Sequence, residues 1–295
     1  MIEGVELVTL LVSESERRYL LYRPPGAADG EPRPAIVFLH GTGGTADWAD
    51  GETGWSAAAA RENFILAIPE GAPPDPAKPP KFLTNPPRWN DGSTRPNDPL
   101  HSNARDVEFL TAVIADIIHR GPVDPLRVSV TGFSNGAGMT FRLAAERAEL
   151  LAAVVPVAGH CWVPDPRPAV PVPTLYIIGD ADPLIPLHGG TIRIPWGGRL
   201  VRRPTVTETL EKWAHAIGCS PVSEIVSDAH GIREERYPSA SSSVGAEFRA
   251  LFVAGLGHHW PGGKGQLNPR IGGPPSARLD ATARIWAFFQ DQRRV

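Results

Sequence analysis

A strand-like run that leads into a serine flanked by glycines constrains the fold of this 295-residue chain more than any other feature. Residues 126–131 are typical of a buried strand, and the residues after Ser134 are typical of a helix. Between them stands Gly132-Phe133-Ser134-Asn135-Gly136. A sharp strand-to-helix turn leaves room only for small residues two positions before and two after its serine. We therefore expect a nucleophile elbow in which Ser134 Oγ stands clear of the backbone.

Apolar runs alternate with helix-like segments along the rest of the chain. Runs typical of strands cover residues 5–12, 17–22, 35–39, 64–68, 153–157, 173–178 and 248–253. Helical spacing covers residues 53–63, 103–120, 134–148, 206–217 and 277–290, with Ser102 or Asn103 placed to cap the second helix. This alternation predicts an α/β fold with a mostly parallel central sheet and helices on both faces. No repeat, linker or separate lid domain is evident, so residues 1–295 are expected to form a single domain.

Charge and composition set the expected surroundings of the chain. A formal net charge of −3 gives no reason to expect nucleic acid or an anionic membrane as partner, and Arg199, Arg202 and Arg203 are interpreted as solvated surface residues. No window of about 18 apolar residues predicts a membrane-spanning helix. The first residues lack the basic and apolar regions of a signal peptide, which favours a cytoplasmic location, with secretion or export to the periplasm after removal of a signal as the alternative. A monomer or homodimer is expected.

Cysteine and metal-ligand patterns are sparse. Cys161 and Cys219 are too few for a disulfide scaffold or a four-cysteine zinc site, although one bridge between them remains open. Asp180 and Asp182 lie in one loop and His258 and His259 in another, without the spacing of a metal-binding pair. We expect neither a metal nor a cofactor.

Chemically reactive side chains follow the predicted strands at their carboxyl ends, where ligands bind in open α/β sheets. Asp182 comes after the strand that ends near residue 178, and His258 comes after the strand that ends near residue 253. A serine hydroxyl needs a base to activate it and an acidic partner to orient that base. Ser134, His258 and Asp182 are the candidates, in the chain order of α/β-hydrolases. Asp180 is interpreted as a turn residue, and Asp182 is preferred because it precedes Pro-Leu-Ile-Pro.

Two backbone donors are expected to stabilise the oxyanion of such a site. The first is the N–H of Asn135, at the start of the predicted helix, where the helix dipole favours negative charge. The second is the N–H of Thr42 in the loop His40-Gly41-Thr42-Gly43-Gly44, which follows the strand at residues 35–39. The ring of His40 is expected to have a structural role, bonded to loop carbonyls.

Seven of the eight tryptophans divide into two groups by their position. Trp213 and Trp286 lie on helical apolar faces and are predicted to be core residues. The loops that follow strands, and other irregular segments, contain Trp48, Trp89, Trp162, Trp196 and Trp260. These five, with His259, are candidates to line a substrate cleft, and Trp260 is the best of them; the alternative is that several only anchor loops. Access is expected to depend on the Pro-rich segment 73–99 and the loop 192–198.

Several stretches together resemble the polyhydroxybutyrate depolymerase and feruloyl esterase group of α/β-hydrolases, which includes the LpqC-like esterases. They are residues 39–44, 89–90, 106–110, 123–128, 132–139, 152–159, 182–183, 213–219 and 257–263. The Gly-His-x-Trp-Pro-Gly segment is the most specific, and it places the catalytic histidine of the family on His258 rather than His259. The resemblance implies a secreted or periplasmic carboxylic-ester hydrolase for hydroxyalkanoate or hydroxycinnamate esters, with Ser134, Asp182 and His258 as its triad.

The chain departs from this resemblance in its cysteines. In relatives the counterpart of Cys219 commonly pairs with a cysteine shortly after a tyrosine, whereas residues 237–240 here are Tyr-Pro-Ser-Ala. Cys219 is therefore either free or paired with Cys161, and the missing bridge suits a reducing compartment.

The hypothesis is a serine carboxylic-ester hydrolase that works through an acyl-enzyme on feruloyl-type aromatic esters or short hydroxyalkanoate esters. Its partners would be small-molecule or oligomeric esters. The alternatives are a polyester depolymerase, a serine peptidase of the same fold and a non-catalytic binding module.

Overall fold

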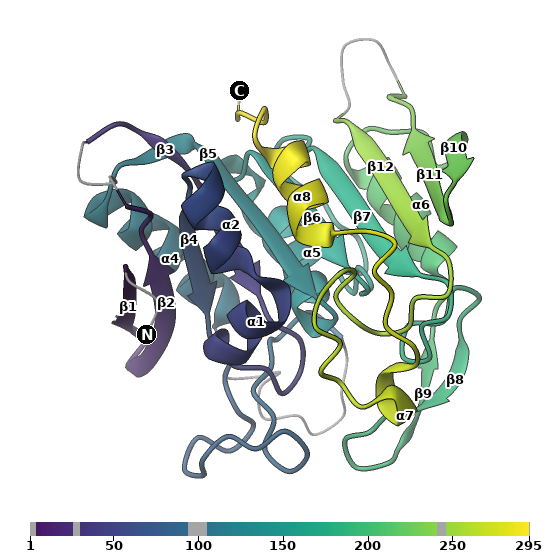
Figure 1. Cartoon of the computed structure of the whole chain (residues 1–295), viewed down its shortest axis with the longest axis horizontal. Coiled ribbons are helices and arrows are strands. Elements are labelled where there is room, and N and C mark those ends of the chain that lie inside the picture. The colour runs from purple at the N-terminus through teal and green to yellow at the C-terminus, as the bar shows by residue number, and fades with distance from the viewer. Residues whose placement is uncertain (1–3, 26–29, 94–104, 241–245, 295) are drawn as a thin grey trace.

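Ten strands form one sheet in the order β1-β2-β4-β3-β5-β6-β7-β12-β11-β10 (Figure 1). The structure is a computed structural model that describes residues 4–25, 30–93, 105–240 and 246–294. The strands are β1 (Val5–Val12), β2 (Ser15–Tyr22), β3 (Arg33–Leu39), β4 (Ile65–Pro69), β5 (Val123–Phe133), β6 (Ala153–Val157), β7 (Thr174–Gly179), β10 (Glu224–Ala229), β11 (Ile232–Tyr237) and β12 (Phe248–Val253). Parallel pairing joins β4, β3, β5, β6, β7 and β12. Antiparallel strands complete both ends of the sheet.

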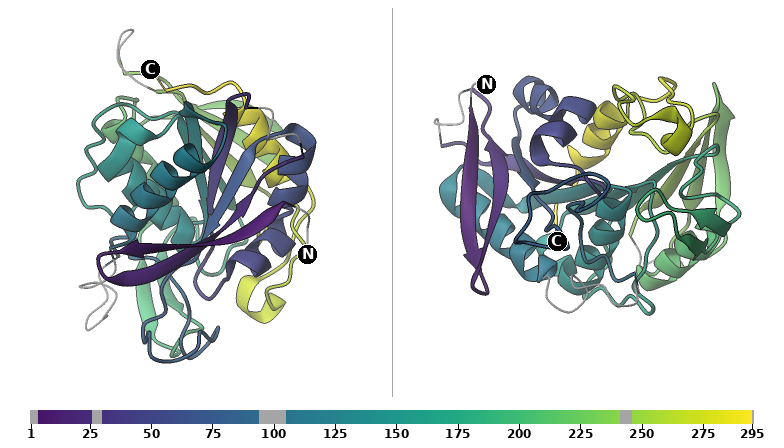
Figure 2. Two further views of the ribbon diagram at one scale, coloured as in Figure 1. Left: turned by 90° about the vertical axis from the view of Figure 1, so that its left-hand side faces the viewer. Right: turned by 90° about the horizontal axis from the view of Figure 1, so that it is seen from below.

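Helices cover both faces of the sheet (Figure 2). One face carries α4 (Asp106–Arg120), α5 (Asn135–Arg147) and α6 (Val206–Ala216), and the other carries α1 (Ala46–Thr53), α2 (Trp55–Glu62) and α8 (Ala281–Phe289). The alternation along β3 explains this sandwich, because Val37 and Leu39 join the first core cluster while Ile36 and Phe38 join the second. The predicted mostly parallel α/β architecture is confirmed.

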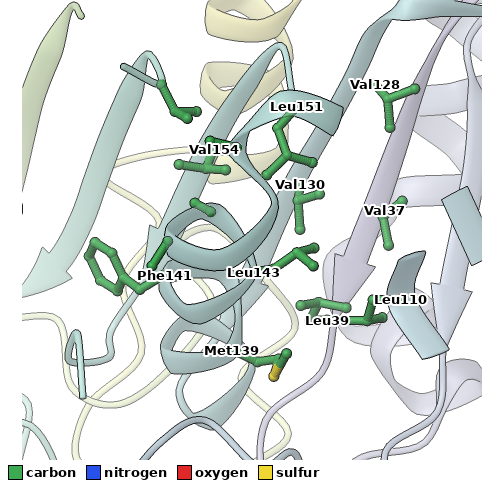
Figure 3. Close-up of a cluster of buried hydrophobic side chains, with 14 of the residues drawn as sticks. Val37, Leu39, Leu110, Val128, Val130, Met139, Phe141, Leu143, Leu151 and Val154 are labelled. Carbon is green, nitrogen blue, oxygen red and sulfur yellow. The ribbon is translucent and has the colours of Figure 1, made fainter. Parts of the chain in front are cut away.

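Helix α5 is the central helix of the first face, and it packs directly on the sheet (Figure 3). Its side chains Met139, Phe141 and Leu143 are fully buried; Leu143 points toward Val130 of β5 and Leu39 of β3, whereas Phe141 lies on the other side of the helix. Burying side chains of this size contributes about 1.5–3 kcal/mol each to stability. Since α5 begins immediately after Ser134, this packing also fixes the position of that serine.

Two helices differ from the expected ranges. The segment predicted as one helix at residues 53–63 belongs to two helices, because Gly54 adopts a left-handed conformation (φ 69°) between α1 and α2. The last helix begins after Asp280, whose side chain accepts a hydrogen bond from the Ala283 N–H, and not at residue 277. The capping role expected of Ser102 or Asn103 falls outside the described residues.

Short elements beyond those predicted complete the fold. Strands β10 and β11 extend the sheet past β12, a separate hairpin pairs β8 (Gly190–Arg193) with β9 (Leu200–Arg203), and α7 (Pro269–Gly272) follows the His258 loop. Cys161 and Cys219 are both buried and free, so the possible bridge between them does not form. None of the described helices combines the length and the apolarity needed to cross a bilayer.

Candidate active site

Ser134 occupies the sharp turn between β5 and α5. Its backbone has φ 58°, a conformation that costs a non-glycine residue about 1–3 kcal/mol. A Cβ atom on Gly132 would lie 2.8 Å from Thr140 Oγ1, and one on Gly136 would collide with the carbonyl oxygen of Leu39. The glycines are therefore required because helix α5 and strand β3 pass too close for a side chain.

Three strand ends bring one hydroxyl, one imidazole and one carboxylate into a line. His258, just after β12, places Nε2 2.8 Å from Ser134 Oγ. Its Nδ1 lies 2.7 Å from Oδ2 of Asp182, which follows β7. All three predicted residues thus meet at the carboxyl edge of the parallel strands, and both His258 and Asp182 are buried.

Asp182 is held in place by backbone donors as well as by the histidine. Its Oδ1 accepts hydrogen bonds of 2.8 Å from the N–H groups of Leu184 and Ile185. Asp180, two residues earlier, turns away and accepts a hydrogen bond from the Gly255 N–H at 2.7 Å. Asp180 is therefore the turn residue that the sequence suggested.

The partner of each nitrogen defines the direction of the hydrogen bonds. A carboxylate only accepts, so Asp182 requires the proton of neutral His258 to lie on Nδ1. Nε2 is then left to accept the Ser134 hydroxyl proton. Phe133 packs its ring against the imidazole with the centroids 4.8 Å apart, which restricts the ring further.

The two expected oxyanion donors both lie next to Ser134. Asn135 is the first residue of α5, where backbone N–H groups have no partner within the helix. Thr42 lines the same cavity as Ser134. The N–H groups of its neighbours Gly43 and Gly44 are already bonded, to Pro87 O at 2.7 Å and Gly41 O at 3.0 Å.

The side chain of Asn135 has a second function that sequence reasoning missed. Its Oδ1 accepts from Trp89 N–H at 2.7 Å, and its Nδ2 donates to Trp89 O at 3.0 Å and to Asp91 Oδ2 at 2.7 Å. These bonds tie the loop around residues 89–91 to the start of α5. The side chain of Asn135 therefore holds the cavity wall in place, in addition to the oxyanion-binding role expected of its backbone N–H.

His40 is a structural residue, as the sequence suggested. Gly71 N–H donates to its Nε2 at 2.9 Å, so the proton of the neutral ring lies on Nδ1 and is donated to Gly41 O at 2.7 Å. Complete burial lowers the pKa of His40, which keeps the ring neutral. The ring thus fixes the loop that carries Thr42.

A cavity of about 230 Å³ opens beside Ser134. It is lined by Thr42, Asn135, Gly159, His160, Trp162, Leu184, Ile185, Ile194, Trp196 and a set of arginines, among others. Trp162 and Trp196 therefore lie where the sequence placed them, at the cavity. Pro86 and Arg88 from the Pro-rich segment and Ile194 from the hairpin segment also line it, so both segments expected to govern access contribute walls.

Trp89 and Trp260 do not line this cavity, although Trp260 lines a second, smaller cavity together with His258. Trp89 is 2% exposed and donates from Nε1 to His40 O at 2.8 Å. Trp260, the preferred candidate, is 3% exposed, packs against Phe38 at 5.2 Å and donates to Thr282 Oγ1. Both are correctly described as anchors of loops, because each indole N–H is bonded inside the protein.

Trp48 and His259 line the second, much smaller cavity of about 20 Å³, which His258 and Trp260 also line. His259 donates from Nε2 to Gly273 O at 2.9 Å and does not line the cavity that contains Ser134. Trp48 is 36% exposed at the mouth of this cavity. Trp213 is a fully buried core residue as predicted, and Trp286 packs on the core with its ring stacked on Phe64.

Arg199, Arg202 and Arg203 were expected on the open surface, but they line the cavity beside Ser134. The hairpin β8–β9 carries them there, and Arg203 Cζ lies 5.5 Å from the centre of the Trp162 ring. The hairpin is too short and too polar to be detected from hydrophobic periodicity, so this placement could not be predicted.

His160 is a further cavity residue that sequence reasoning missed. It is 1% exposed, with Nδ1 2.8 Å from Thr209 Oγ1. Burial, together with the positive charges of Arg203 and Lys212, lowers its pKa to about 3 against the opposing effect of Asp182. The ring is therefore neutral at ordinary pH.

This lowered pKa predicts a pH-dependent stability. The folded protein resists protonation of His160 while the unfolded chain accepts it near pH 6.5, so stability is complete above pH 6.5 and is lost as the pH falls toward 3. At pH 5 the loss is about 2 kcal/mol. The free energy of unfolding, measured with denaturant, should therefore fall less between pH 7 and pH 5 in His160→Gln than in the wild type. His119→Gln, at an exposed histidine, is the control and should behave like the wild type. An equal fall in the wild type and both variants would contradict the lowered pKa of His160.

Among the described residues, no group of three or more His, Cys, Asp or Glu side chains is arranged to hold a metal ion.

Known proteins match this chain over most of its length. The phospholipase/carboxylesterase family matches residues 27–217. NocK, a provisionally named esterase from Nocardia uniformis subsp. tsuyamanensis, is 33% identical over 92% of this chain and 78% of its own length. Feruloyl esterase B from Piromyces equi is 25% identical over 69% of this chain, which spans 36% of that protein.

Solved structures of esterases share the fold. Acetyl xylan esterase from Aspergillus awamori superimposes with a TM-score of 0.61 at 15% identity, covering 97% of this chain and 98% of that one. Esterase PE8 superimposes with a TM-score of 0.57 at 16% identity, covering 98% of this chain and all of that one. The chain has the α/β-hydrolase fold and belongs to the phospholipase/carboxylesterase family of hydrolases.

Proposed function

We propose that this protein is a serine carboxylic-ester hydrolase that works through an acyl-enzyme. The observation that carries the proposal is the chain of hydrogen bonds from Ser134 through His258 to Asp182, at 2.8 and 2.7 Å, beside a cavity. A hydroxyl is a weak nucleophile at neutral pH, and a neutral imidazole within hydrogen-bond distance is the group that activates it. Membership of a carboxylesterase family supports an ester as the substrate.

The first half of the reaction forms the acyl-enzyme. Ser134 Oγ attacks the ester carbonyl carbon while His258 Nε2 takes the hydroxyl proton. Asp182 stabilises the resulting imidazolium, and the N–H groups of Asn135 and Thr42 bind the oxyanion. His258 then gives its proton to the leaving alcohol, the ester C–O bond breaks and the acyl group remains on Ser134.

The second half repeats these steps with water. His258 takes a proton from water as the water attacks the acyl carbon, and it returns that proton to Ser134 Oγ when the acid leaves. The reaction needs no group beyond those of the chain and the solvent.

For the substrate we propose feruloyl-type aromatic esters or short hydroxyalkanoate esters. Feruloyl esterase B is among the relatives, and Trp162 and Trp196 line the cavity beside Ser134, where flat rings stack well. A cavity of 230 Å³ suits a small acyl group rather than a bulky one.

The test is the initial rate of hydrolysis of methyl ferulate, p-nitrophenyl butyrate and a linear 3-hydroxybutyrate oligomer, with Ser134→Ala protein as the blank. Turnover of methyl ferulate above that of the butyrate is expected if the tryptophans hold an aromatic acyl group. A preference for the oligomer would instead support polyester hydrolysis. Activity on none of the three, in a folded protein, would overturn the proposal in favour of a binding module.

A further inference from the structure

The cavity beside Ser134 has an excess of positive charge. Of the described residues that line it, four are arginines, namely Arg88, Arg199, Arg202 and Arg203, and one is an acid, Asp91. Asp91 is already engaged, because its Oδ2 accepts from Asn135 Nδ2 and its Oδ1 accepts from Ser93. The described hydrogen bonds of this carboxylate are therefore to Ser93 and Asn135 of the cavity wall, and not to Arg199 or Arg202.

Arg199 and Arg202 carry the argument furthest. Both are exposed, and neither lies within ion-pair distance of an acidic side chain in the part of the chain that the structure describes. Both belong to the β8–β9 hairpin, where Arg202 pairs in register with Thr191. Like charges placed close together on a short hairpin repel one another, so their concentration at a cavity is costly unless an anion occupies it.

The hairpin is positioned to deliver these charges to the site. Trp196, in its turn, donates from Nε1 to Phe82 O at 2.8 Å, and its ring packs on Phe82 with the centroids 5.8 Å apart. This contact holds the hairpin against the Pro-rich segment, and Arg199 and Arg202 line the cavity while remaining exposed to solvent.

His160 provides a second and independent sign of a ligand. Its Nε2 atom is buried and has no hydrogen-bond partner among the described residues, although the ring lines the cavity. A buried polar atom without a partner costs about 1–3 kcal/mol. When Nδ1 accepts the Thr209 hydroxyl proton, Nε2 carries a hydrogen and can donate it to an oxygen of a bound molecule.

The geometry of the proposed reaction decides which part of the ester enters this cavity. His258 must protonate the leaving alcohol, so the alcohol lies on the side of Ser134 that faces His258. His258 lines the small cavity with Trp48 and Phe133, and it is not among the lining residues of the larger one. Thr42 and Asn135, which face the acyl oxygen, do line the larger one. The larger cavity is therefore the acyl side.

We propose that the cavity also accepts an acyl group that ends in a carboxylate, which Arg199 and Arg202 bind. Half-esters of dicarboxylic acids are then substrates in addition to the esters proposed above, and Leu184, Ile185 and Ile194 of the same cavity offer apolar contacts to their acyl chain. The step is ordinary hydrolysis: the ester C–O bond breaks, water adds, and the products are the dicarboxylate and the alcohol. This inference rests on the proposed ester hydrolysis and adds the charge of the acyl group to it.

A matched pair of esters tests the proposal. Mono-4-nitrophenyl adipate and 4-nitrophenyl hexanoate have acyl chains of equal length and the same leaving group, and they differ only in a terminal carboxylate or methyl group. We expect kcat/KM for the adipate to exceed that for the hexanoate by roughly tenfold at low salt, after subtraction of the buffer rate. The ratio should fall toward one as salt is raised, because exposed charges are screened.

The variants separate this inference from the proposed function. Arg199→Gln with Arg202→Gln should bring the ratio of the two esters close to one, through a fall of roughly tenfold in kcat/KM for the adipate. Arg236→Gln, an exposed arginine of β11 remote from the cavity lining, should keep the wild-type ratio. Hydrolysis of hexanoate without a preference for adipate would overturn the inference alone. Failure to hydrolyse either ester would overturn the ester hydrolase itself.

Discussion

Ser134→Ala protein is expected to lose turnover of 4-nitrophenyl esters by between about 10⁴- and 10⁶-fold. In the proposed mechanism Ser134 Oγ bonds to the acyl carbon and gives its proton to Nε2 of His258, which lies 2.8 Å away. Alanine removes Oγ and keeps the backbone that α5 packing fixes. Stopped-flow absorbance at high enzyme concentration should show a burst of 4-nitrophenol in the wild-type protein and none in the variant.

A matched control for this change is Ser129→Ala, on the same strand β5 but five residues before the elbow. It should retain both the burst and steady-state turnover. Thermal unfolding of the two variants should confirm that each is folded. A normal burst from folded Ser134→Ala protein would exclude this serine as the nucleophile.

Asp182→Asn is expected to lower kcat by about 10⁴-fold while leaving the fold intact. Oδ1 of an asparagine can still accept from Leu184 and Ile185, so its Nδ2 would then face Nδ1 of His258. Two donors cannot face each other, so the imidazole must move its proton to Nε2. Nε2 is then a donor, and Ser134 has lost its base.

Asp180→Asn provides the control from the same loop. Its Oδ1 accepts from the Gly255 N–H, a bond that asparagine preserves, and it has no contact with His258 in the described structure. We expect kcat within a factor of about two of the wild type. Equal losses in both variants would mean that the loop as a whole, and not the Asp182 carboxylate, supports activity.

The sequence was informative about the central fold because burial and periodicity agree there. Residues 35–39 and 153–157 are apolar throughout, and the matching strands β3 and β6 are covered on both faces by helices. The elbow could also be predicted from the sequence, because the close approach of neighbouring atoms leaves no room for a side chain at Gly132 or Gly136. Positions relative to strand ends then sufficed to bring Ser134, His258 and Asp182 to one edge.

The elements that could not be predicted have no periodic pattern of apolar residues. Strand β10 is exposed along its whole length and is held by backbone hydrogen bonds to β11, so its side chains have no periodic pattern to detect. Trp260 was predicted to line the substrate cleft because it follows a strand, but it does not line the larger cavity beside Ser134. A loop position says nothing about which way an indole turns, and here it turns into the aromatic core beside Phe38.

The separation between the rigid elbow and the β8–β9 hairpin has a consequence for how such a protein can change. The hairpin lies outside the ten-stranded sheet and forms its own two-stranded unit. Insertions or replacements there would alter the lining of the cavity without disturbing the strands that hold Ser134. Divergence in selectivity can therefore proceed by exchange of a single segment, and the same hairpin offers protein engineers a graft site outside the sheet that positions Ser134.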